Sequence, residues 1–235
     1  MSTNTLNNQL PIIFLGDHHG DWSELFYLIN KNKLADCYII SVGDCGIGFE
    51  LKSFQIKAVK RLNNLFAEKN IFFKAIRGNH DDPAYFRGSD RICLDNFELI
   101  EDYSVYEYNS KLIQFIGGAI SIDRTGRTEN VSYWIEEKVS FNEEACKKVD
   151  VLVTHTAPSF CFPRAFNEIV YGWAKEDEYL IEDLNNERFL MDKIFKLCDP
   201  SFHFYGHFHS SWSEEINSCK HRLLTIDELF EFKRI

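Results

Sequence analysis

The chain has 235 residues, 45% of them hydrophobic and 15% aromatic, and a formal net charge of −10. This composition excludes a disordered chain and predicts one globular domain over residues 1–235. The negative charge argues against binding of long nucleic acids, which needs many Lys and Arg contacts to phosphates, but it leaves a small phosphorylated substrate open.

No apolar stretch approaches the roughly 20 residues needed to cross a bilayer. The opening MSTNTLNNQL lacks the basic-then-apolar order of a signal peptide. We therefore expect a cytoplasmic protein that does not engage a membrane, and the sequence makes no prediction of its oligomeric state. The cysteines are odd in number, scattered, and form no Cys-x-x-Cys pair: Cys37, Cys45, Cys93, Cys146, Cys161, Cys198 and Cys219. We expect free thiols rather than a cysteine-based metal or redox site.

Short apolar runs rich in β-branched and aromatic residues predict buried strands. They cover residues 11–15, 37–42, 71–76, 112–121, 149–154 and 201–205. Early strands alternate with stretches of helical spacing, whereas the later strands follow each other more closely. This order predicts a β-α-β layout at the start of the chain and meanders toward its end.

Three stretches between these runs have the spacing of helices. Residues 22–31 follow Asp21, a candidate N-cap with Glu24 three positions on, as in a capping box. A second helix is expected over residues 53–70, with one apolar face made of Phe54, Ala58, Leu62, Leu65 and Phe66. A third is expected over residues 187–200, which stop at a proline. Residues 156–186 are the most irregular region, and we expect either a lid over a site or a plain surface excursion.

Polar residues of the kind that bind metals follow five of the predicted strands. They are Asp17, His18 and His19; Asp44; Asn79, His80 and Asp81; His155; and His207 and His209. Functional groups of open α/β folds gather at the carboxyl ends of the strands, so these loops are expected to converge on one crevice. Each block alone could equally be a turn, a helix cap or a structural histidine. The evidence for a functional site is therefore the occurrence of all five blocks in one chain.

The combined side chains have the chemistry of a catalytic metal site. Carboxylate oxygens, imidazole nitrogens and an amide oxygen are ligands that Mn, Fe(II) and Zn accept, and the set contains no thiolate. This composition points away from a closed structural zinc site and toward an open catalytic one.

The order Gly-Asp-x-His-Gly, Gly-Asp, Gly-Asn-His-Asp, a later His and Gly-His-x-His, found over residues 16–209, resembles that of the calcineurin-like metallophosphoesterase superfamily. The resemblance implies an α/β fold, a four-layer α/β/β/α sandwich of two mixed sheets flanked by helices. It also implies a hydrolase of phosphoric ester bonds. Such an enzyme would hydrolyse a phosphomonoester or phosphodiester with a hydroxide activated by two metals.

The same resemblance assigns roles to individual residues. Asp17, His19 and His209 would bind one metal, Asp44 would bridge both metals, and Asn79, His155 and His207 would bind the second. A bridging carboxylate offsets the repulsion between two close cations. The cofactors implied are two divalent ions, with Mn the first choice and Fe or Zn as alternatives. His80 would face the substrate as an acid or electrostatic stabiliser, and His18 would not be a ligand.

Two arginines are candidates for gripping the phosphate. Arg77 precedes the Gly-Asn-His-Asp block, and Arg124 lies with Arg127 in a polar loop after the predicted strand 112–121. Either could form a bidentate contact with phosphate or a structural ion pair. The second block continues Cys-Gly instead of Asp-Arg-Gly, which weakens assignment to the Ser/Thr protein phosphatase branch.

Three alternatives remain beside a phosphoesterase for small substrates. One is a nuclease acting on short single-stranded nucleic acid, and another is a catalytically weak metal-binding scaffold. The third is a partner-regulated phosphatase that docks through exposed aromatics such as Trp173 and Tyr179.

Overall fold

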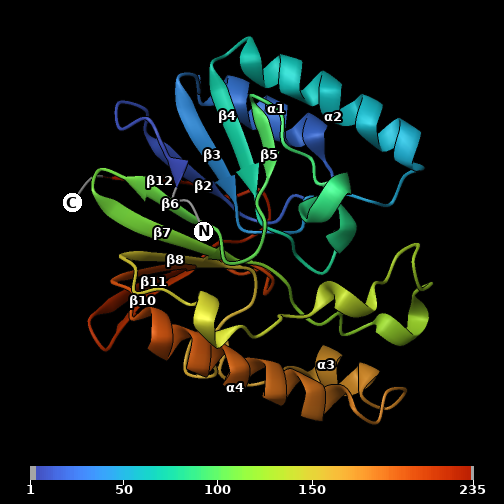
Figure 1. The fold of residues 1–235 in the computed structure, drawn as a ribbon. Coiled ribbons are helices and arrows are strands. Elements are labelled where there is room, and N and C mark those ends of the chain that lie inside the picture. The colour runs from blue at the N-terminus through green and yellow to red at the C-terminus, as the bar shows by residue number, and fades with distance from the viewer. Residues whose placement is uncertain (1–3, 234–235) are drawn as a thin grey trace.

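A computed structural model describes residues 4–233 and shows two β-sheets stacked face to face (Figure 1). The smaller sheet has the order β12-β2-β3-β4-β5, with β2 to β5 parallel and β12 antiparallel to β2. In chain order its strands are β2 (Ile12–Leu15), β3 (Cys37–Ser41), β4 (Ile71–Ala75), β5 (Phe97–Leu99) and β12 (Leu229–Phe232).

The larger sheet has seven strands in the order β1-β6-β7-β8-β9-β11-β10. Its central strands β7, β8, β9 and β11 are parallel. The strand β6 pairs antiparallel with β7 and parallel with β1, and β10 pairs antiparallel with β11. The strands are β1 (Asn4–Thr5), β6 (Val105–Tyr108), β7 (Lys111–Ile116), β8 (Val151–Thr154), β9 (Phe202–Tyr205), β10 (Trp212–Ile216) and β11 (Cys219–Leu223).

Helices cover both outer faces of the sheet pair (Figure 1). The helices α1 (Trp22–Lys31) and α2 (Lys52–Ala67) lie on the five-stranded sheet, and α4 (Leu180–Cys198), with α3 (Glu168–Trp173) beside it, lies on the seven-stranded sheet. Short 3-10 helices span Pro83–Phe86, Gly88–Asp90, Arg124–Gly126, Ile135–Glu137 and Glu143–Ala145. The predicted α/β/β/α sandwich is confirmed.

The predicted helix over residues 22–31 is confirmed together with its cap. The side chain of Asp21 accepts a hydrogen bond from the Glu24 amide at 3.0 Å, as an N-cap does. The amide of Asp21 itself donates to the His18 carbonyl, so only half of the capping box forms. The third helix is longer than predicted, because α4 begins at Leu180.

The face predicted for α2 is partly wrong. The helix buries Gln55, Val59, Leu62 and Phe66, whereas Phe54 is 61% exposed. Phe66 stacks on Phe73 of β4, with ring centroids 5.1 Å apart, and this contact fixes the rotation of the helix on the sheet. That rotation turns Gln55 inward at the other end, where its side chain accepts a hydrogen bond from the Gly48 amide.

The space between the two sheets is filled by side chains from both. Phe14 on β2 stacks on Phe204 on β9, with ring centroids 3.9 Å apart, and Ile40 and Val153 are buried in the same cluster. The strands β2, β3 and β8 are buried along their whole length because helices or the other sheet cover each face. The strand ends that carry the polar loops are therefore held by a dense core.

The first part of the irregular region 156–186 is tied to α4. The guanidinium of Arg188 is buried and donates to the carbonyls of Pro158, Cys161 and Pro163. The second part forms α3 and the start of α4. No helix in the described part of the chain is long and apolar enough to cross a membrane.

Candidate metal centre

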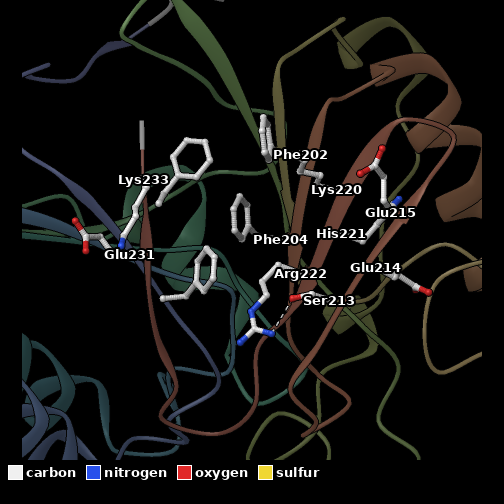
Figure 2. A pocket seen from close by; sticks show the side chains of 12 residues that line it. Phe202, Phe204, Ser213, Glu214, Glu215, Lys220, His221, Arg222, Glu231 and Lys233 are labelled. Carbon is white, nitrogen blue, oxygen red and sulfur yellow. Dashed lines mark hydrogen bonds between the residues drawn. The ribbon is translucent and has the colours of Figure 1, made fainter. Parts of the chain in front are cut away.

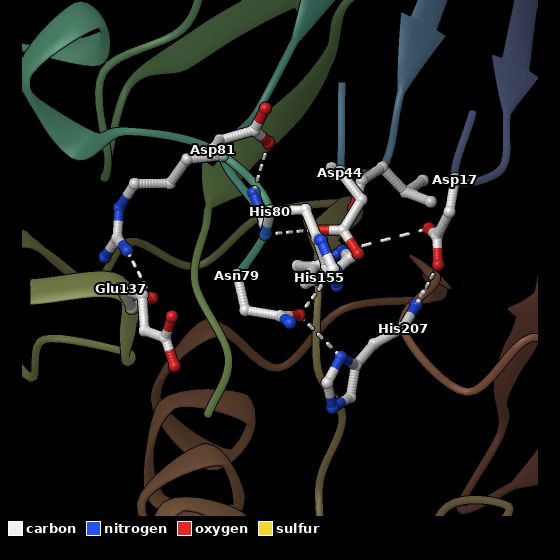
Figure 3. A network of polar contacts seen from close by, with 12 residues as sticks. Asp17, Asp44, Asn79, His80, Asp81, Glu137, His155 and His207 are labelled. Carbon is white, nitrogen blue, oxygen red and sulfur yellow. Dashed lines mark hydrogen bonds and ion pairs between the residues drawn. The ribbon is translucent and has the colours of Figure 1, made fainter. Parts of the chain in front are cut away.

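The loops that follow β2, β3, β4, β8 and β9 meet at one edge of the sheet pair (Figure 3). Three of them come from the five-stranded sheet and two from the seven-stranded sheet. The predicted convergence is therefore observed, and it brings together side chains up to 190 residues apart in the sequence.

One group of potential ligands forms around Asp17. Donor atoms of Asp17, His19, Asp44 and His209 all lie within 4.8 Å of one another. The Nε2 atoms of His19 and His209 are 3.1 Å apart, and Nε2 of His209 lies 3.5 Å from Oδ2 of Asp17. These are the residues expected for the first metal together with the bridging carboxylate.

A second group forms around the side-chain oxygen of Asn79 (Figure 3). That oxygen lies 3.1 Å from Nε2 of His155 and 2.9 Å from Nδ1 of His207. These three side chains are the ones expected to hold the second metal.

Asp44 lies between the two groups and faces both. Its Oδ1 atom is 3.2 Å from Nε2 of His155, and its Oδ2 atom is 3.9 Å from Nε2 of His19. The carboxylate also accepts a hydrogen bond from the His80 amide at 2.8 Å, which fixes its orientation. Although burial raises the pKa of Asp44, His155 outweighs it and holds that pKa far below its usual value.

The backbone of these loops is unusual. His19, Asp44, His207 and His209 all have a positive φ, a conformation that non-glycine residues rarely adopt. Gly206 is needed for a different reason, because a Cβ atom there would lie 2.2 Å from Oδ1 of Asp17. Strain that is concentrated at a site is typical of groups held ready for a ligand.

The residues present fit a cation. Asp17 is fully buried, and its Oδ1 atom has no hydrogen-bond partner in the described part of the chain. Burial raises the pKa of this carboxyl group to about 8, and His155 only partly offsets the rise. A buried carboxylate oxygen without a partner is costly, and a bound cation would supply the missing partner.

The orientation of His155 also suits a ligand. Its Nδ1 atom lies 2.8 Å from the Val42 carbonyl, so the ring donates there and directs Nε2 into the centre. Burial lowers the pKa of this histidine, but the charges of Asp44 and Asp17 outweigh it and raise the pKa to about 10. Metal binding therefore has to displace a proton from this ring.

Two residues that the sequence analysis missed orient Asn79. The amide nitrogen of Asn79 donates to Oγ of Ser121 at 3.1 Å, and Ser121 in turn donates to Glu137 through its hydroxyl at 2.9 Å and its amide at 2.6 Å. This chain fixes which end of the Asn79 amide faces the histidines. Ser121 is the last residue of the predicted strand 112–121, but no spacing in the sequence links it to Asn79.

Asp81 links two of the loops that surround the centre, although no role was predicted for it. Its carboxylate accepts hydrogen bonds from the amides of Cys45, Ile47 and Gly78, at 2.8 to 3.1 Å. It thereby joins the loop after β3 to the loop after β4. Burial and the charge of Asp44 raise its pKa to about 7.

His80 lies at the margin of the centre, with its ring centroid 4.7 Å from that of His19. Its Nε2 atom is 2.9 Å from the guanidinium of Arg127, which also pairs with Asp123 at 2.7 Å. Because arginine only donates, the His80 ring accepts at Nε2. Burial, supported by the charge of Arg127 and opposed by that of Asp44, lowers the pKa of His80 to about 4.

The structure holds the two predicted phosphate-binding arginines elsewhere. Arg77 is buried, and its guanidinium donates to Asp102 and to the carbonyls of residues 136 to 138. Arg124 makes a bidentate contact with Asp177 and a further ion pair with Asp183. Within residues 4–233, neither of these arginines contacts a predicted ligand, whereas Arg127 lies beside His80 at the margin of the centre. Arg77 and Arg124 are held by Asp102 and Asp177, which lie 25 and 53 residues away in the sequence, so the local sequence could not show that these two arginines form structural ion pairs.

A separate pocket of about 530 Å³ lies along β9, β11 and β12 (Figure 2). It is lined by the aromatic rings of Phe202, Phe204, Phe230 and Phe232 and by charged residues of the neighbouring strands. None of the predicted site residues is among its lining residues. The pocket is therefore distinct from the metal centre.

Two stacked sheets whose strand ends gather carboxylates and histidines define a class of metal-dependent α/β hydrolases. Within that class, the chain belongs to the calcineurin-like phosphoesterase family, whose family model matches residues 10–211. It is a metal-dependent hydrolase that acts on phosphoric ester bonds. No curated protein sequence matches the chain.

Several solved structures align with most of the chain at low identity. A conserved uncharacterized protein of Streptococcus pneumoniae, a predicted phosphoesterase, is 14% identical, with a TM-score of 0.35 over 92% of this chain and 72% of that one. Phosphopantetheinyl hydrolase of Mycobacterium tuberculosis is 11% identical, with a TM-score of 0.44 over 94% and 96%. GAP50, the anchor in the inner membrane complex of Plasmodium, is 16% identical, with a TM-score of 0.44 over 92% and 71%.

Proposed function

We propose that this phosphoesterase hydrolyses a small phosphomonoester or phosphodiester at a centre of two divalent cations. The observation that carries the proposal is the position of Asp44. One of its oxygens faces His155 and the other faces His19, so a single carboxylate borders both groups of ligands. A carboxylate in this position suits two adjacent cations, since it offsets their mutual repulsion.

The proposed ligands divide between the two cations. Asp17, His19 and His209 would hold one cation, Asn79, His155 and His207 the other, and Asp44 both. When bound, the cations supply positive charge for the phosphate oxygens and lower the pKa of a water molecule to near neutrality. Oxygen and nitrogen donors without thiolate suit Mn²⁺, our first choice, with Fe or Zn as alternatives.

His80 and Arg127 would act on the substrate from the margin of the centre. The guanidinium of Arg127 can donate to a phosphate oxygen while it orients His80 through Nε2. The other ring nitrogen of His80 then carries hydrogen, and this neutral ring would stabilise the leaving oxygen of the ester by donating a hydrogen bond. We therefore assign binding of the substrate phosphate to Arg127 and His80 instead of Arg77 and Arg124.

The test uses protein stripped of metal and reloaded with Mn²⁺. Release of p-nitrophenol is followed from p-nitrophenyl phosphate and from bis-p-nitrophenyl phosphate, and bound Mn²⁺ is counted. We expect Mn²⁺-dependent turnover, two bound ions, and loss of turnover in Asp44→Asn. The preferred ester separates a monoesterase from a diesterase.

The matched control is Asp192→Asn, which removes a carboxylate on α4 that accepts hydrogen bonds from Ser159, a residue outside the proposed ligand set. This variant should keep both turnover and bound Mn²⁺. A single bound ion at full activity, or full activity in Asp44→Asn, would refute the two-cation centre.

A further inference from the structure

A second cluster of potential metal ligands lies outside the proposed centre. His203 on β9 and His221 on β11 occupy paired positions in the sheet, and Cys161 comes from the loop after β8. All three side chains are at most 2% exposed. They lie on the helix side of the sheet, where Phe195 of α4 stacks on His221 at a centroid distance of 5.3 Å.

The donor atoms of Cys161 and His203 both lie at nearly the spacing of zinc ligands from Nδ1 of His221. Sγ of Cys161 lies 3.2 Å from Nδ1 of His221, and Nδ1 of His203 lies 3.1 Å from the same nitrogen. All three atoms are within 4.8 Å of one another. Ligand atoms of tetrahedral zinc are roughly 3.3–3.6 Å apart, given Zn–N bonds of about 2.0–2.1 Å and Zn–S bonds of about 2.3 Å. The two separations at His221 lie within a few tenths of an ångström of these values.

The hydrogen bond on the far side of His203 prepares it as a ligand. The hydroxyl of Thr154 donates to the Thr156 carbonyl, so its oxygen accepts from Nε2 of His203 at 2.8 Å. A neutral His203 therefore directs the lone pair of Nδ1 into the cluster. Burial and His221 lower the pKa of His203 far below its usual value, which keeps this ring neutral.

Without a cation the contacts among the three residues cannot all be satisfied. A proton on Nδ1 of His221 can be donated with normal geometry to only one of its two neighbours, Nδ1 of His203 or Sγ of Cys161. If that proton is on Nε2 instead, two bare ring nitrogens face each other at 3.1 Å. In addition, Nε2 of His221 has no hydrogen bond of ordinary geometry among the described residues, and burial lowers the pKa of the ring although Glu214 and the backbone of Ile216 oppose this. One cation would satisfy all three lone pairs.

We propose that Cys161, His203 and His221 bind one Zn²⁺ ion. Two imidazoles and a thiolate are ligands that zinc prefers, and the fourth position is left to a water molecule or small anion. Binding replaces the proton of the Cys161 thiol, which passes to solvent. Burial raises the pKa of that thiol, so a cation is needed to hold the thiolate there.

This ion would be separate from the two cations proposed above. His203 precedes His207 by four residues, which corresponds to about 13 Å along the chain in an extended strand. The ion would link the start of the region 156–186 to β9 and β11. It also departs from the expectation that no cysteine of this chain serves a metal site.

The test replaces zinc by Co²⁺, whose bond to a thiolate gives a charge-transfer band in the near ultraviolet. None of the ligands proposed for the centre at the strand ends is a thiolate, so loss of this band in Cys161→Ala assigns it to Cys161 whether or not the enzyme is active. We expect the band in the wild-type protein and in Cys198→Ala, a buried cysteine of α4, and its loss in Cys161→Ala. Zinc-loaded wild type should hold one more equivalent of zinc than Cys161→Ala.

A wild-type protein that takes up Co²⁺ without this band would overturn the proposal, as would a band that persists in Cys161→Ala. Should Cys161→Ala fail to fold, X-ray absorption of the zinc-loaded wild-type protein decides. A Zn–S distance of about 2.3 Å supports the site, and a spectrum fitted by oxygen and nitrogen alone overturns it.

Discussion

Replacing Ser121 by alanine should weaken one bound cation while leaving the fold intact. The hydroxyl group of Ser121 accepts from Asn79 at 3.1 Å and donates to Glu137 at 2.9 Å. Without it, the Asn79 amide loses the contact that fixes which end faces His155 and His207. Loss of such a supporting contact typically weakens metal binding about 10–100-fold, or about 1.4–2.7 kcal/mol.

The free energy of unfolding should decrease much less in Ser121→Ala than in a variant that lacks the Glu137 carboxyl group. Glu137 keeps its hydrogen bond from the Ser121 amide, so we expect a loss of about 1–3 kcal/mol, as for one buried polar group that loses a partner. Calorimetric titration of the metal-free protein with Mn²⁺ measures the affinities, and urea unfolding measures the stability.

Asn79 belongs to only one of the two groups, so one Mn²⁺ affinity should fall while the other changes little. The matched control is Ser159→Ala, which removes a hydroxyl that donates to Asp192 at 2.7 Å without touching a proposed ligand. Unchanged affinity for both ions in a folded Ser121→Ala protein would refute the role assigned to this hydroxyl.

Three further substitutions test other parts of the site and fold. Arg127→Ala should lower kcat/KM about 10–100-fold in steady-state kinetics with little change in Mn²⁺ affinity, because a charge-assisted contact beside His80 is lost. Gly206→Ala should abolish Mn²⁺ binding, measured by metal analysis after gel filtration, since its Cβ atom would lie 2.2 Å from Oδ1 of Asp17. Burial raises the pKa of Glu187 from 4.5 to about 7. As the pH rises between those values, the unfolding free energy of the wild-type protein should therefore fall relative to that of Glu187→Gln, by up to about 1.4 kcal/mol per pH unit, as measured by urea unfolding.

Each of these expectations has an outcome that contradicts it. Arg127→Ala with wild-type kinetics would remove Arg127 from the site, and Arg61→Ala on α2 serves as its surface control. Normal Mn²⁺ content in Gly206→Ala would show that the loop can yield without loss of the centre. Unfolding free energies that stay parallel between pH 4.5 and 7 would show that the Glu187 carboxyl group is not held protonated by the fold.

The loops of the centre could be predicted because their signal is local. Each consists of a short apolar strand followed within two residues by a glycine and a ligand-type residue, or directly by His155, and parallel strands bring such ends to one edge. The strands β2, β3 and β4 were predicted to within a residue or two for the same reason. Family resemblance then supplied the roles, which local pattern alone could not.

Features that depend on long-range pairing were missed. The strands β10 and β11 each carry two charged residues among five, and Glu231 interrupts β12, so none of them gives an unbroken apolar run to detect. Cys161, His203 and His221 come together only because β11 pairs with β9 in one particular register. The spacing of these three residues in the sequence gives no indication of that register.

The stack of Phe14 on Phe204 has a consequence for the chemistry at the edge. Phe14 lies three residues before Asp17, and Phe204 lies three residues before His207, so this one contact between the sheets stands directly behind a ligand loop on each side. The distance between the two sheets thereby sets the distance between the ligand loops of the five-stranded sheet and those of the seven-stranded sheet. Enzyme activity should thus respond to core volume: a smaller side chain at Phe204 would change catalysis through the spacing of the two layers, without altering any group that meets substrate.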